Sequence, residues 1–126
     1  MKFALIVALG GALGSTLRYY LSSWTVQQSM DWRFPVATFS VNVIGCLLAG
    51  ILAGLVVKHD AFSPEVRLFL FTGLAGGFTT FSAFGLETFQ LLRRGEVLVA
   101  GSYVVSSIVL GVVVVWLGFA LVTARG

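Results

Sequence analysis

The chain has 126 residues, of which 58% are hydrophobic and only 10% charged, and its mean hydropathy is +1.00. A soluble domain of this size has too little interior to bury so much apolar surface, so the composition indicates a membrane protein. The net charge of +3 comes from basic residues that stand singly or in pairs. They form no basic face for a phosphate backbone to follow, which argues against nucleic-acid binding.

Four apolar segments predict an all-α membrane protein with four transmembrane helices. The predicted spans are residues 3–24, 35–57, 64–92 and 96–123, with a polar segment at 25–33. Each is long enough to cross a bilayer core of about 30 Å. Pro35 suits the first turn of the second helix, where its missing N–H costs nothing. Ser63, Pro64 and Glu65 supply a cap, a first-turn proline and an acidic residue for the third. Residues 1–126 are predicted to form one domain.

The basic residues divide evenly between the two predicted sides of the membrane. One side carries Lys2, Lys58, Arg67 and Arg125, and the other carries Arg18, Arg33, Arg93 and Arg94. The positive-inside rule therefore selects no orientation. Either a subtler signal sets the orientation, or the protein inserts both ways and pairs head to tail as an antiparallel, dual-topology homodimer, which would replace an inverted repeat.

The third span carries the strongest local signal, residues 73–84 (GLAGGFTTFSAF). Glycines and a Thr79-Thr80 pair are poor helix formers, so they favour a break in the middle of the span. A break frees backbone groups that lipid cannot satisfy, and membrane proteins tolerate this where the chain lines a cavity or binds an ion. The alternative is a continuous helix in which the glycines serve packing.

Several polar and aromatic residues inside the spans are candidates for a functional site, because intramembrane polar groups are costly. Asn42 either holds two helices together or donates its amide to an anion. Phe81 and Phe84 share a helix face, as packing residues or as rings whose positive edges face an anion. Tyr103 and Ser107 share a face of the fourth span. Glu87, near the end of the third span, lies at the interface, pairs with an arginine or belongs to the site.

These residues together resemble the Fluc (CrcB-type) family of fluoride channels over nearly the whole chain. The matching pieces are residues 10–15 (GGALGS) with Arg18, residues 38–42 followed by Gly45, and residues 76–84 (GGFTTFSAF). Two positions depart from the family pattern. Gly111 stands where some relatives carry a serine, and Phe78 stands where we expect leucine.

The resemblance implies an antiparallel homodimer in the inner (plasma) membrane that conducts fluoride passively out of the cytoplasm and relieves its toxicity. It implies a structural Na⁺ at the dimer axis, bound by the backbone carbonyls of Gly76 and Thr79. It places the fluoride pathway at Asn42, Phe81, Phe84, Ser82, Thr38, Tyr103 and Ser107, with Glu87 near a vestibule and Arg18 near an aqueous entrance. Weakly held positions suit conduction. No nucleotide-binding motif is visible.

The main rival is a small dual-topology proton-coupled exporter of the multidrug-resistance type. Such exporters need a titratable carboxylate in the first helix, and residues 3–24 contain no Asp or Glu. A second rival is a non-conducting subunit of a membrane assembly, which predicts tolerance of substitution at Asn42. A membrane enzyme is disfavoured, because no nucleophile–base pair or metal-ligand set is visible.

Overall fold

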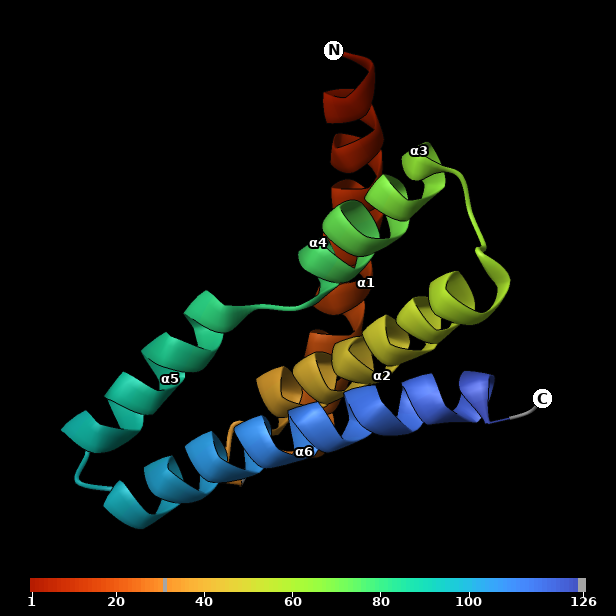
Figure 1. The fold of residues 1–126 in the computed structure, drawn as a ribbon. Coiled ribbons are helices and arrows are strands. Elements are labelled where there is room, and N and C mark those ends of the chain that lie inside the picture. Colours follow the sequence, from red (N-terminus) through yellow and green to blue (C-terminus); the bar gives the residue numbers. More distant parts are fainter. Residues whose placement is uncertain (31, 125–126) are drawn as a thin grey trace.

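The computed structural model describes residues 1–30 and 32–124, and the regular structure in these residues is all helical. The elements are α1 (Lys2–Gln28), α2 (Val36–His59), α3 (Pro64–Arg67), the π-helix η1 (Leu68–Ala75), α4 (Gly76–Phe78), α5 (Phe81–Arg93) and α6 (Val97–Thr123) (Figure 1). The third apolar segment, Pro64–Arg93, contains α3, η1, α4 and α5. With α1, α2 and α6 it makes four segments long and apolar enough to cross a membrane, as predicted.

The first two helices differ from the predicted ones in two details. α1 continues to Gln28, into the segment predicted to be a polar connection. Polar side chains do not by themselves stop a helix, and Thr25 Oγ1 donates a hydrogen bond within the helix to the Leu21 carbonyl at 2.7 Å. Pro35 precedes α2 instead of lying in its first turn. The start of the third span is confirmed, since Val66 N–H donates to Ser63 Oγ at 3.3 Å. The sequence carried no signal for the π-helix.

The ends of the helices carry the basic residues, apart from Arg18. Lys2 pairs with Glu65 at 3.3 Å, Arg67 pairs with Asp60 at 2.7 Å, and Lys58 Nζ donates to the Val122 carbonyl at 2.8 Å, all at one end. Arg33, Arg93 and Arg94 lie at the connections of the other end. Arg18 lies well before the end of α1, and Arg125 lies outside the described residues. The direction of membrane insertion stays a prediction.

Glycines set two close helix contacts. Gly10 and Gly14 of α1 face η1 and α4: a Cβ on Gly10 would lie 2.9 Å from the Gly73 Cα, and one on Gly14 would lie 2.9 Å from the Phe78 nitrogen. In the second contact, α2 packs along α6 (Figure 1), where a Cβ on Gly118 would lie 2.7 Å from the carbonyl oxygen of Leu47. Only a residue without a Cβ lets these backbones approach so closely.

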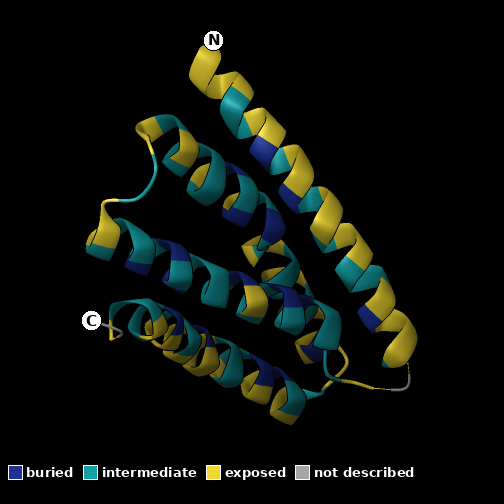
Figure 2. Cartoon of the chain, turned by 90° about the vertical axis from the view of Figure 1, so that its right-hand side faces the viewer, coloured by how far each residue is buried: buried dark blue, intermediate teal, exposed yellow. Residues whose placement is uncertain are grey.

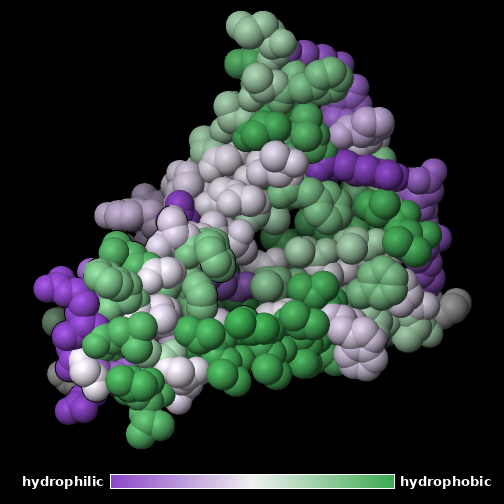
Figure 3. Space-filling model, turned by 60° about the vertical axis from the view of Figure 1, so that its left-hand side comes forward, coloured by the Kyte–Doolittle hydropathy of each residue, from purple (hydrophilic) through white to green (hydrophobic). Residues whose placement is uncertain are grey.

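Much of the apolar surface stays exposed in the single chain. Exposed residues cover the outer face of α1 in Figure 2, and apolar side chains spread across the face seen in Figure 3 while hydrophilic ones gather towards its margins. A small core of Leu91, Ala100 and Tyr103 lies between α5 and α6, with Phe34 and Phe84 packed against it. An apolar exterior over so small a core is what lipid or a second subunit covers.

Candidate functional site

The third span is interrupted at Thr79 and Thr80, which both have extended backbone, with φ/ψ of −86°/158° and −148°/113°. Helix resumes at Phe81, where Thr80 Oγ1 caps α5 by accepting from Ala83 N–H at 3.2 Å. The first half of the span packs on α1, and the second half leaves α1 and runs beside α6 (Figure 1). The predicted break is therefore present.

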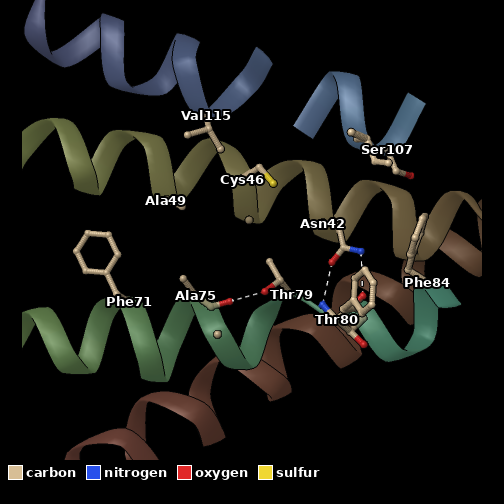
Figure 4. Close-up of a pocket in the computed structure, with 14 residues that line it drawn as sticks. Asn42, Cys46, Ala49, Phe71, Ala75, Thr79, Thr80, Phe84, Ser107 and Val115 are labelled. Atoms are coloured by element: carbon tan, nitrogen blue, oxygen red, sulfur yellow. Dashed lines mark hydrogen bonds between the residues drawn. The ribbon is translucent and has the colours of Figure 1, made fainter. Parts of the chain in front are cut away.

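Asn42 on α2 holds the break from the opposite side. Its Oδ1 accepts from Thr80 N–H at 2.8 Å, and its Nδ2 donates to the Thr80 carbonyl at 3.0 Å (Figure 4). The amide thus supplies the backbone partners that a helix would have given Thr80. The interhelical hydrogen bond considered for Asn42 is present, and one Nδ2–H remains for another acceptor.

Arg18 on α1 reaches the same break. Its Nε donates to the Gly77 carbonyl at 3.1 Å. Arg18 follows Gly10 and Gly14 at intervals of four residues, so all three share the helix face that packs on the third span. This contact brings a positive charge to the break, in the middle of the span.

Two backbone carbonyls at the break have lost their helical partners. In an α-helix Gly76 O would accept from Thr80 N–H and Thr79 O from Ala83 N–H. Both donors instead bind side chains, Asn42 Oδ1 and Thr80 Oγ1. In residues 1–30 and 32–124 no group of three or more His, Cys, Asp and Glu could hold a metal. Main-chain oxygens suit a hard cation, so Gly76 and Thr79 fit the predicted Na⁺, whose binding stays a prediction.

A cavity of about 470 Å³ opens beside the break, between the third span and the α2–α6 pair (Figure 4). We call it the break cavity; its lining includes Asn42, Thr79, Thr80, Phe81, Phe84 and Ser107. Phe81 is 83% exposed, and the Phe81 and Phe84 rings lie 5.7 Å apart. The Ser107 hydroxyl is buried and has no hydrogen-bond partner among the described residues. The cavity therefore brings ring edges, an amide and an unpartnered hydroxyl around one space.

A second polar cluster continues from the break cavity along α5. Glu87 Oε1 accepts from Thr38 Oγ1 at 2.6 Å, and its Oε2 accepts from Tyr103 OH at 2.8 Å. The ring of Tyr103 lies 5.0 Å from that of Phe84, which lines the break cavity. Of the three interpretations of Glu87, pairing with an arginine does not occur among the described residues.

The predicted site residues thus fall into three places. Asn42, Gly76, Thr79, Phe81, Phe84 and Ser107 line the break cavity; Thr38, Glu87 and Tyr103 form the adjoining cluster; Arg18 and Ser82 line neither. Ser82 Oγ lies 3.4 Å from Thr80 Oγ1. Sequence reasoning treated Thr80 only as a helix breaker and missed that its backbone is the partner of Asn42, a pairing that no local pattern reveals.

Comparison with known proteins identifies the family. Residues 5–119 match the family described as CrcB-like protein, Camphor Resistance (CrcB). A relative from Methylobacillus flagellatus is 61% identical over 122 residues, which cover 97% of this chain and 95% of the relative. One from Rhizobium leguminosarum bv. trifolii is 47% identical and one from Flavobacterium psychrophilum 45%, each over 121 residues, covering 96% of this chain and 96% and 97% of those relatives. All three are named fluoride-specific ion channel FluC. The predicted resemblance is confirmed: this chain, a multi-pass membrane protein, belongs to the CrcB-like family.

Proposed function

We propose that this protein is a fluoride-selective ion channel that lets fluoride leave the cytoplasm passively across the inner (plasma) membrane and so relieves its toxicity. The observation that carries the proposal is the break cavity, where the buried Ser107 hydroxyl has no hydrogen-bond partner in the part of the chain that the structure describes. A buried donor without an acceptor is costly, and a passing anion is an acceptor. The relatives are named fluoride-specific ion channels, so we assign fluoride as the anion.

The pathway follows from the chemistry of fluoride. A small, strongly hydrated anion leaves water only where close donors replace its hydration shell, and several weak positions suit conduction better than one tight site. Asn42 Nδ2, the ring edges of Phe81 and Phe84, and Ser107 Oγ are those donors in the break cavity. Tyr103, Thr38 and Glu87 continue the path along α5, while Ser82 lies beside the break. Arg18 contributes positive charge there.

The channel works as an antiparallel homodimer. The even division of basic residues supports insertion in both orientations. The exposure of Phe81 supports a partner as well, because an aromatic donor on the path needs a wall opposite it. The freed carbonyls of Gly76 and Thr79, one pair from each subunit, bind Na⁺ at the axis and add positive charge beside the anion path.

The geometry gives little support to the proton-coupled exporter. That function needs a titratable carboxylate in the first helix, and α1 as described, Lys2–Gln28, contains no Asp or Glu. A channel is not an enzyme, so the proposal assigns no catalytic residue.

Fluoride efflux from liposomes that contain the purified protein tests the function. We expect efflux without ATP or a proton gradient, hardly any chloride efflux, and none from empty liposomes. A requirement for a proton gradient would favour the exporter, and no efflux at all would favour the assembly subunit. Exchange of sodium for a large organic cation should lower the flux or the stability of the dimer, and Gly76→Leu should disturb the site more than Thr79→Ser.

Topology is tested separately at Ser29, which follows α1. A Ser29→Cys variant, in a Cys46→Ala background, should be labelled by an impermeant thiol reagent in only part of the population in intact cells. Complete labelling, or none while permeabilised cells are labelled, would contradict dual topology.

A further inference from the structure

A second cavity lies at the end of the molecule where the connection before α2 meets the end of α5. Its volume is about 280 Å³, and it shares no lining residue with the break cavity. We call it the end cavity; the lining residues that matter here are Trp32, Arg33, Thr38, Glu87, Gln90 and Arg94. The exposed lining residues are Trp32, Arg33, Gln90 and Arg94, whereas Thr38 is buried and Glu87 is half-buried. The polar lining therefore runs from the surface to the Thr38–Glu87–Tyr103 cluster.

The distribution of charge inside the end cavity is uneven. Glu87 lies at the buried side, and both its carboxylate oxygens accept hydrogen bonds from the hydroxyls of Thr38 and Tyr103. The arginines come from different elements, Arg33 from the connection before α2 and Arg94 from the end of α5. Both ion pairs found in residues 1–30 and 32–124 lie at the opposite end of the molecule.

Ordinary roles explain part of this arrangement. A basic residue such as Arg94 at the end of α5 favours the helix dipole, and arginines near span ends anchor a protein at the membrane surface. Arg93 has the same helix end and the same exposure. It lines a neighbouring pocket with Gln90 and Arg94, but it does not line the end cavity. Neither role explains why Arg33 and Arg94 line one cavity that ends on the polar cluster.

We propose that the end cavity is an anion-collecting site. Arg33 and Arg94 attract a small hydrated inorganic anion, and the Gln90 amide helps to hold it above Thr38 and Glu87. Positive charge in a cleft raises the local concentration of anions and their rate of entry. Binding that depends on exposed side chains stays weak, as conduction requires. This inference rests on the proposed function, since it adds an outer binding site to the same fluoride path.

Trp32 provides a readout that does not depend on conduction. In a Trp24→Phe, Trp116→Phe background it is the one remaining tryptophan, and its fluorescence in detergent reports collisions with iodide, an anionic quencher. Arg33→Gln or Arg94→Gln should lower iodide quenching about twofold or more at low ionic strength, with quenching by neutral acrylamide unchanged. Arg94→Lys should keep most of the effect, and Arg93→Gln is the matched control. Equal losses in Arg93→Gln and Arg94→Gln, or no loss in either arginine variant, would overturn the proposal.

Fluoride flux from liposomes is the second arm. At low ionic strength Arg94→Gln should slow fluoride efflux by about threefold to tenfold, and the deficit should shrink near 1 M salt, where the Debye length falls to about 3 Å. Normal flux in Arg33→Gln, Arg94→Gln and the double variant at low ionic strength would show that the end cavity is no part of the path. If the parent protein itself conducts no fluoride, the proposed function fails, whereas iodide quenching still decides whether the site collects anions.

Discussion

Replacement of Ser107 by alanine should separate stability from conduction. The Ser107 hydroxyl is buried in the wall of the break cavity without a hydrogen-bond partner among the described residues. Mutational data place the cost of such a group at about 1–3 kcal/mol. Ser107→Ala removes that cost together with the hydroxyl, so we expect the free energy of unfolding to stay equal or to rise by up to about 1 kcal/mol. The expected gain is smaller than the full cost, because a serine hydroxyl can also rotate towards a carbonyl of its own helix.

Fluoride efflux through the Ser107→Ala variant should fall, although its stability stays equal or rises. A hydrogen bond to a charged group contributes about 1.5–3 kcal/mol, and each 1.4 kcal/mol corresponds to a tenfold change. If fluoride takes the hydroxyl as one of its donors, Ser107→Ala should lower fluoride efflux by roughly tenfold or more. Unfolding in mixed detergent and efflux from liposomes measure the two quantities on the same preparation.

Ser106 is the matched control. Its hydroxyl donates to the Ser102 carbonyl at 2.5 Å, within α6, and it does not line the break cavity. Ser106→Ala should therefore leave fluoride efflux unchanged. The reasoning about Ser107 is refuted if Ser107→Ala unfolds more easily than the parent by about 1 kcal/mol or more and conducts normally, since the hydroxyl would then have a structural partner.

Three further changes test the break and its supports. Asn42→Leu removes two hydrogen bonds to the Thr80 backbone and should lower the free energy of unfolding by about 1–3 kcal/mol; unchanged unfolding in mixed detergent would show that Asn42 does not hold the break. Phe81→Ile and Phe84→Ile should elute as the parent does yet conduct fluoride poorly, and parental flux in both would make them packing residues. Gly14→Val places a Cβ against the Leu74 carbonyl, so it should lower the free energy of unfolding by about 1–3 kcal/mol. Gly101→Ala is the control, because a Cβ there meets nothing within 4 Å among the described residues. Equal stability of the two variants would contradict the close packing of α1.

Local sequence patterns determined the helical plan. Apolar runs bounded by polar residues predicted the four spans, because a chain in lipid must satisfy its backbone groups within each segment. Ser63 and Pro64 predicted the start of the third span for reasons confined to one helical turn. The break at Thr79 and Thr80 was predictable too, since glycine and threonine lower helix propensity wherever they lie.

Tertiary structure decided which side chains complete the site. Asn42 meets Thr80 and Arg18 meets Gly77 only because the glycine contacts set the rotation and spacing of the helices. Likewise, the Ser107 hydroxyl lacks a partner within residues 1–30 and 32–124 because of what α2 and the third span place opposite α6. Propensity and hydropathy act within a few residues, whereas these contacts join residues 38 and 59 positions apart. A single sequence therefore names the polar residues inside the spans, and only the packing of the helices shows which of them are already bonded and which are left to meet an ion.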